Sequence, residues 1–268
     1  MFGKLLKHEL KSSAPLMLIL SGIALIFGFM GAASLRIMAK TPDTIMNNPE
    51  TGIWIMIAFM LLFYAAYIGI ILYAAASQYI QLFRFYGSRF TDRGYLTFTL
   101  PISTHTNFLS AATNMLIWQS VVYCVTILAI IIMVVGGMAD EFQIITTPTI
   151  EDFANTPWGL FAAMLFLLSV SPIYTVIANM TAVVTACSVF KRMKVLGCIG
   201  FIYALSMVSG FLFTAVMMLS VMPSAFAGND PTPAMAISYI IMGVIMLLAS
   251  VGGYFLSTYL MKKKLNLQ

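Results

Sequence analysis

Six long segments of the chain contain no Asp, Glu, Lys, Arg or His residue. They run from Ala14 to Leu35, Ile53 to Ala76, Phe108 to Met138, Pro157 to Phe190, Val195 to Met222 and Ala234 to Met261. About 20 helical residues cross the ~30 Å hydrocarbon layer of a bilayer, and each segment reaches that length. Backbone groups in hydrocarbon must be paired within the protein, and runs this long favour helices over the short alternating strands of outer-membrane barrels. The sequence therefore predicts an all-α polytopic membrane protein with six transmembrane helices.

The composition excludes an ordinary soluble fold, because 61% of the residues are hydrophobic and only 9% are charged. The 268 residues are interpreted as one transmembrane domain, 1–268, without room for a soluble catalytic module. Cys124, Cys187 and Cys198 lie in or beside apolar segments without the spacing of metal ligands, and we interpret them as reduced packing residues. His8 and His105 are each solitary in the sequence. We accordingly predict no catalytic residue, no metal site and no cofactor site in this chain.

The charges between the apolar segments predict the orientation. Of the 14 basic residues, only Arg36 and Lys40 fall on one side, and the other 12 fall opposite. Those 12 are Lys4, Lys7, Lys11, Arg84, Arg89, Arg93, Lys191, Arg192, Lys194, Lys262, Lys263 and Lys264. The positive-inside rule then predicts that both termini are cytoplasmic. The expected location is the inner (plasma) membrane, which the protein crosses several times. The net charge of +5 is interpreted as this topological bias, with membrane lipid and not nucleic acid as the partner.

The first residues of the chain predict an interfacial amphipathic helix over residues 1–13. Phe2, Leu5, Leu6 and Leu10 share one face by helical spacing, whereas the three lysines of this stretch take the other. One alternative is a basic flank that only fixes topology. A secretory signal ending near Gly31 is the other alternative, and the apolar run is long for a signal core.

The cytoplasmic connection between the second and third spans, residues 77–107, predicts a folded and docked segment. Arg84, Arg89 and Arg93 exclude it from hydrocarbon, while its aromatic and aliphatic residues offer apolar surface to a partner or to the bilayer interface. Gly94 permits a break in a helix, and Pro101 stops a helix or begins the next. The alternative is an interfacial loop that packs on its own spans.

The stretch from Thr91 to Ser103, TDRGYLTFTLPIS, resembles the acidic-X-Gly-hydrophobic and Leu-Pro-hydrophobic-Ser signature of ABC-2-type (type V exporter-like) ABC transporter permeases. Many members of that family carry Glu and a small residue where this chain has Asp92 and Tyr95. The resemblance implies an N-terminal interfacial helix, six spans, and larger outer loops after the first, third and fifth spans. It also implies a cytoplasmic coupling helix between spans 2 and 3 that seats in a groove of an ATPase subunit. The implied ATPase-coupling residues are Asp92, Arg93, Gly94, Tyr95, Leu96, Leu100 and Pro101. We predict a secondary ATPase contact at Lys191, Arg192 and Lys194, and the alternative is that these are solvated charges that only fix topology.

The energy for transport is expected to come from another polypeptide. The chain contains no Gly-X-X-X-X-Gly-Lys-Ser/Thr phosphate-binding loop, so ATP and Mg are expected in a partner ATPase and this chain is predicted to be a transport subunit rather than an enzyme. The resemblance implies two ABC ATPase subunits and a second permease subunit, as a homo- or heterodimer.

Polar residues within the spans are the candidates for a substrate path. Ion-coupled carriers generally need ionisable groups at the bilayer midplane, and the six apolar segments contain none. The candidates for substrate contact are Asn114, Gln119, Asn179, Tyr64 and Tyr67. Their alternative role is helix-to-helix hydrogen bonding and packing. In the fourth span, Pro172 predicts a kink.

Two functions remain open at this point. The first is the permease subunit of an ATP-driven exporter that moves a hydrophobic or amphiphilic substrate such as a peptide, a lipid or a drug-like compound. The second is a non-transporting membrane scaffold or immunity-type protein that binds a cytoplasmic partner. A neighbouring reading frame that encodes an ATPase with a phosphate-binding loop would favour the first.

Overall fold

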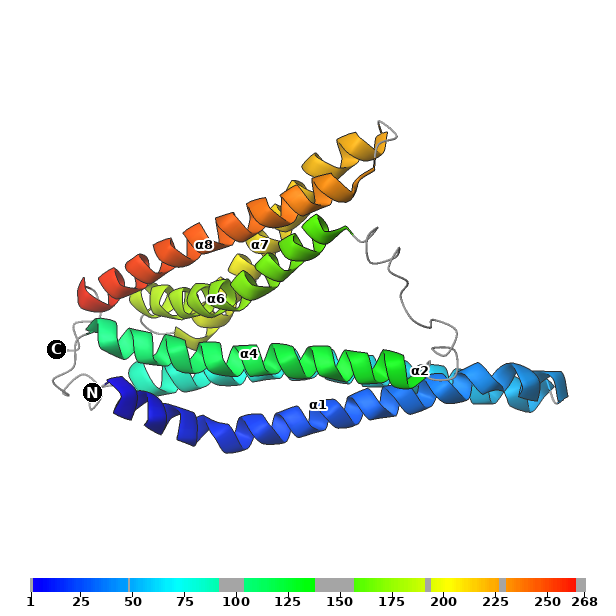
Figure 1. Ribbon diagram of the computed structural model, residues 1–268. Coiled ribbons are helices and arrows are strands. Elements are labelled where there is room, and N and C mark those ends of the chain that lie inside the picture. The colour runs from blue at the N-terminus through cyan, green and yellow to red at the C-terminus, as the bar shows by residue number, and fades with distance from the viewer. Residues whose placement is uncertain are drawn as a thin grey trace. The chain divides into compact units, whose positions relative to one another are not determined.

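The computed structural model describes residues 2–47, 49–91, 104–137, 157–190, 194–226 and 230–263. These residues form six helices, α1 (Phe2–Asn47), α2 (Pro49–Arg89), α4 (Thr104–Gly137), α6 (Trp158–Val189), α7 (Lys194–Phe226) and α8 (Thr232–Lys263) (Figure 1). Within the same ranges there is no strand. Each helix is long and apolar enough to cross a membrane. For the described residues, the prediction of an all-helical fold with six helices long and apolar enough to span a membrane is confirmed.

The predicted interfacial helix over residues 1–13 is not a separate element, because α1 runs without interruption for 46 residues. A helix of that length extends about 69 Å, which is more than twice the hydrocarbon thickness. Figure 1 shows that α1 bends near its N-terminal end. Pro15 belongs to this part of the helix and lacks the N–H that would bond to the carbonyl of Lys11. The proline therefore accounts for a bend without ending the helix.

The helices also occupy two regions that were predicted as loops. The connection after the first span is short, because α1 ends at Asn47 and α2 begins at Pro49. The predicted cytoplasmic connection 77–107 is helical at both ends, since α2 continues to Arg89 and α4 begins at Thr104. Leu82 and Phe85 are buried on one side of this α2 extension, whereas Phe83 is 52% exposed. The apolar surface on one side keeps the extension helical beyond the predicted span.

The helices fall into two compact units, and α1, α2 and α4 each contribute residues to both. The first unit consists of Met1–Lys7, Gln81–Leu116 and Asn155–Gln268. Its core combines the end of α2 and the start of α4 with α6, α7 and α8. Helix α6 packs against both α7 and α8, and the helix continues through Pro172. Thr181 of α6 lies at the contact with α8, where Ser257 donates a hydrogen bond to its Oγ1 at 3.0 Å.

The second unit consists of His8–Ile80 and Ile117–Ala154. Small residues allow α1 and α4 to approach closely, since a Cβ added at Gly28 would lie 2.8 Å from the carbonyl oxygen of Ala129. Two buried hydrogen bonds join α1 to α4 and α1 to α2, respectively. Trp118 donates from Nε1 to Ser13 Oγ at 2.8 Å, and the hydroxyls of Ser21 and Tyr73 lie 2.9 Å apart. Close backbone packing and interhelical hydrogen bonds are the usual means of holding membrane helices together.

Candidate functional site

Arg89, in the last turn of α2, is buried at 4% exposure and connects α2 to α4. Its Nε donates to Asn107 Oδ1 at 3.2 Å, and its Nη2 donates to the Asn107 carbonyl oxygen at 3.2 Å. Its Nη1 donates to Ser88 Oγ at 3.0 Å. A planar guanidinium presents a fixed fork of donors that suits both oxygens of one asparagine, whereas a lysine ammonium has no such fork. Arg89 and Asn107 therefore tie the end of α2 to the start of α4.

Aromatic rings surround this hydrogen-bonded pair. The Arg89 guanidinium carbon lies 5.1 Å from the centroid of the Phe85 ring. Phe85 makes edge contacts with Phe90 at 5.7 Å and with Phe108 at 6.5 Å between ring centroids. A cation over a ring face and edge-to-face ring pairs are both favourable, and burial increases the first effect. The rings thus compensate part of the cost of burying the charge.

Helix α8 completes the group through Tyr254. The Tyr254 hydroxyl lies 3.2 Å from Nδ1 of His105, and its ring meets Phe108 edge-on at 5.6 Å. We call Phe85, Arg89, Phe90, His105, Asn107, Phe108 and Tyr254 the Arg89 cluster. Phe85, Phe90 and Phe108 also belong to the core shared with α6 and α7. The cluster is therefore anchored in the packed helices of the first unit.

The Arg89 cluster joins the two helix ends that flank, in the sequence, the segment that carries the motif. Residues 92–103 lie between α2 and α4, immediately after one anchor and immediately before the other. The interactions in the cluster are hydrogen bonds and ring contacts. Contacts of this kind hold α2, α4 and α8 together, and they do not form a catalytic arrangement. Among the described residues, no group of three or more His, Cys, Asp or Glu side chains is placed to hold a metal ion.

Most of the predicted coupling residues lie outside the described residues. These are Asp92, Arg93, Gly94, Tyr95, Leu96, Leu100 and Pro101, together with Lys191 and Arg192 of the secondary contact. Lys194 is described, and it is the half-buried first residue of α7.

The five predicted substrate-path residues occupy different environments. Asn114 and Asn179 belong to the first unit, whereas Gln119, Tyr64 and Tyr67 belong to the second. Gln119 is buried at 4% exposure, while Tyr64 and Tyr67 are 48% and 45% exposed. Tyr64 makes an edge contact with its neighbour Phe63 at 5.8 Å. The structure therefore places two of the five candidates in one unit and three in the other.

The pairing of Arg89 with Asn107 is the main feature that sequence reasoning missed. Arg89 counted only as one of the cytoplasmic topology charges, and Asn107 carried no signal. The available signal was local, since Phe85 lies four residues before Arg89 and i, i+4 neighbours share a helix face. Its partner Asn107, on α4, is 18 residues away in the sequence, and no helical periodicity connects Arg89 with Asn107.

Comparison of the chain with protein-family models, with curated proteins and with solved structures found no match.

Proposed function

We propose that this protein is the membrane subunit of an ATP-driven exporter of the ABC-2 (type V exporter-like) class. The observation that carries the proposal is the buried Arg89 cluster, which joins the end of α2 to the start of α4, the two helix ends that flank the motif segment, residues 92–103, in the sequence. A cytoplasmic segment that transmits the movement of a closing ATPase to the helices needs a rigid connection to those helices at both ends. Hydrogen bonds from a charged donor contribute about 1.5–3 kcal/mol each, and Arg89 makes two of them to Asn107.

In this proposal the 92–103 segment is the coupling helix that docks on an ABC ATPase. Asp92, Arg93, Gly94, Tyr95, Leu96, Leu100 and Pro101 form the docking surface, and Lys191, Arg192 and Lys194 form a secondary contact. The ATPase binds ATP and Mg, and this chain contributes no catalytic residue. The charge bias supports cytoplasmic termini in an inner (plasma) membrane.

We further propose a hydrophobic or amphiphilic substrate that moves along a path shared with a second permease subunit. The support is the chemistry of the six apolar segments, which contain amides and hydroxyls but no Asp, Glu, Lys, Arg or His. Asn114, Gln119, Asn179, Tyr64 and Tyr67 remain the candidate contacts, and the half-exposed Tyr64 and Tyr67 are accessible to a partner or a substrate.

The test replaces Tyr95 and Leu96 together by Asp. Burial of two unpaired carboxylates in a docking groove would cost several kcal/mol, so co-purification of the ATPase with the tagged chain is expected to fall while membrane insertion stays normal. The matched control, Tyr95→Phe with Leu96→Met, keeps the apolar surface and should retain the ATPase.

Two results would contradict the proposal. If the double Asp variant keeps both its ATPase and substrate-stimulated hydrolysis, the 92–103 segment is not the coupling element. If the wild-type chain binds a cytoplasmic partner that shows no substrate-stimulated ATP hydrolysis, the scaffold or immunity-type function is favoured instead.

A further inference from the structure

Two buried cysteines meet where α6 ends and α7 begins. Cys187 belongs to the last turn of α6, Cys198 lies near the start of α7, and both are free thiols in the core of the first unit. The Cys198 thiol donates a weak hydrogen bond to the carbonyl oxygen of Val183, with 3.9 Å between the two atoms. In an α-helix that carbonyl also accepts the N–H of the residue four positions later, which is Cys187. The Cys198 sulfur therefore lies against the turn of α6 that carries Cys187, and a side-chain hydrogen bond joins the two thiols.

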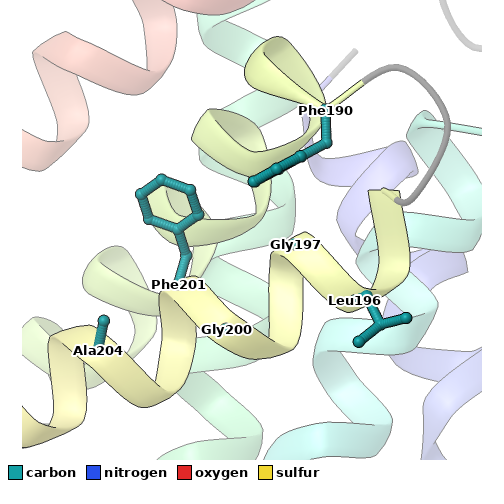
Figure 2. Close-up of a pocket in the computed structure, with 6 residues that line it drawn as sticks. All are labelled: Phe190, Leu196, Gly197, Gly200, Phe201 and Ala204. Atoms are coloured by element: carbon teal, nitrogen blue, oxygen red, sulfur yellow. The ribbon is translucent and has the colours of Figure 1, made fainter.

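The residue before Cys198 lets α7 approach the end of α6. A Cβ added at Gly197 would collide with the ring of Phe190, and Phe190 meets Phe201 edge-on at 6.3 Å between ring centroids. An apolar groove of about 410 Å³ lies beside this contact (Figure 2) and is lined by Phe190, Leu196, Gly197, Gly200, Phe201 and Ala204. Close packing of α6 on α7 thus keeps the two cysteines next to each other.

Lys194 favours the reactive form of Cys198. The lysine lies four residues before Cys198 on α7, so the two side chains share one face of the helix. Its charge also acts on the Cys187 thiol. The thiolate is the nucleophile in thiol oxidation, and a neighbouring lysine stabilises it. Cys198 is therefore the thiol better placed to react first, with Cys187 in position to react second.

We propose that Cys187 and Cys198 form a reversible redox site, which a small hydroperoxide oxidises to a disulfide that links the end of α6 to the start of α7. The Cys198 thiolate attacks a peroxide oxygen, the O–O bond breaks, and a sulfenic acid forms. For hydrogen peroxide the leaving group departs as water and takes up the thiol proton. The Cys187 sulfur then attacks the sulfenic sulfur, the S–O bond breaks, and a second water leaves with the Cys187 proton. The two sulfurs lose two electrons in total, the peroxide accepts them, and a reducing dithiol reverses the change.

The disulfide would form beside the end of α2. Tyr86 of α2 packs against the same core and interacts electrostatically with both cysteines. Its ring stacks on Phe90, a member of the Arg89 cluster, at 6.2 Å between centroids. The charge bias predicts that this end of the protein faces the cytoplasm, where disulfides are transient and serve redox sensing or catalysis. The inference is independent of the transport proposal, because it requires neither an ATPase nor a substrate.

The test counts free thiols in the purified full-length chain that carries Cys124→Ser, which removes the exposed third cysteine. The protein is treated with hydrogen peroxide in mild detergent, denatured in SDS, and labelled with a polyethylene-glycol maleimide that shifts the band once for each free thiol. Both thiols should be labelled before the treatment and neither after it, and dithiothreitol should restore both. Lys194→Gln should slow the loss of label about threefold, because the smaller thiolate fraction is partly offset by the greater nucleophilicity of a more basic thiolate.

Cys187→Ser and Cys198→Ser, each in the same Cys124→Ser background, are the matched controls. With Cys187→Ser the sulfenic acid at Cys198 has no second thiol to attack it, so dimedone should capture it. With Cys198→Ser the thiol that shares a helix face with Lys194 is absent, so the remaining thiol should keep its label.

Three results would overturn the proposal. The first is retention of both labels by the Cys124→Ser protein after hydrogen peroxide. The second is a loss of label that dithiothreitol does not restore, which would indicate irreversible oxidation of separate thiols. The third is an oxidised product at the mass of two chains on a non-reducing gel, which would assign the disulfide to two copies of the protein.

Discussion

Arg89 is both charged and buried, and the two properties make opposite demands on its surroundings. Its charge favours the aqueous end of α2, yet 96% of its surface is buried, since its exposure is 4%. The guanidinium tolerates burial because Asn107 accepts two of its hydrogen bonds and Phe85 covers one face. Removal of one partner would leave the other buried without its bonds, and such a loss costs more than the net value of the bonds themselves.

The substitution Arg89→Met tests this dependence. Asn107 would lose both hydrogen bonds from Arg89, and we expect the free energy of unfolding to fall by about 1–3 kcal/mol for each buried acceptor left unpaired. The measurement is the thermal unfolding midpoint of the purified protein in detergent. An Arg89→Met midpoint equal to that of the wild type would show that the hydrogen bonds to Asn107 do not stabilise the protein.

At the scale of the helices, small residues decide which elements can approach. Gly28 of α1 faces the backbone of Ala129, and Gly31 faces the side chain of Met133, both in α4. In lipid there is no hydrophobic force between helices, so contact area and close approach supply the stability. A backbone atom cannot move aside as a flexible side chain can, which makes Gly28 the stricter position.

Gly28→Ala is therefore expected to destabilise the protein, although alanine is the better helix former. Its Cβ would lie 2.8 Å from the carbonyl oxygen of Ala129, and overpacking of this kind costs about 1–3 kcal/mol. Gly22→Ala is the matched control in the same helix, where the new Cβ meets nothing within 4 Å. Unfolding by denaturing detergent should occur earlier for Gly28→Ala and no earlier than wild type for Gly22→Ala. A tolerated Gly28→Ala would refute the close α1–α4 packing.

The start of α8 depends on a carboxylate. Asp230 Oδ1 accepts hydrogen bonds from the Thr232 hydroxyl at 2.6 Å and from the Thr232 backbone N–H at 2.9 Å. These bonds, the hydroxyl first, lower the pKa of Asp230 below its ordinary value of 3.8. A lowered pKa means that the stabilisation is present above pH 3.8 and is lost as the pH falls through the lower, folded value.

Asp230→Ala should accordingly lower the unfolding midpoint at neutral pH, and the difference from wild type should shrink as the pH falls below 3.8. This difference is measured by thermal scans of both proteins at about pH 7, 5, 4 and 3. Thr232→Ala, which removes one of the two donors, should show a smaller effect with the same pH dependence. A difference that persists unchanged at the lowest pH would exclude the carboxylate as its cause.

At the scale of the whole molecule, the six helices and the charge bias together predict which ends face the cytoplasm. Single cysteines at Asn48 and Glu151, in a background without Cys124, Cys187 and Cys198, should react with an impermeant thiol reagent added outside intact cells. Cysteines at Lys4 and Lys263, which are exposed residues, should react only after the membrane is opened. The reverse pattern would overturn the orientation derived from the positive-inside rule.

The sequence by itself determined that the protein is built from long apolar helices, and it determined the approximate place of each of the six helices that could cross a membrane. Exclusion of charge from hydrocarbon is a local requirement, because an ionised side chain pays its cost at its own position whatever the other helices do. The helix ends were less predictable. Whether α2 continues to Arg89 depends on Leu82 and Phe85 finding buried neighbours, and those neighbours come from other helices.

Only the tertiary structure decided which polar groups meet and where space remains. Asn107 lies 18 residues from Arg89, and Ser257 lies 76 residues from Thr181. The groove along α7 depends on how Phe190 and Phe201 stand over Gly197 and Gly200. Periodicity relates residues of one helix to each other, whereas these contacts depend on the packing of two helices, for which a single sequence contains no repeating signal.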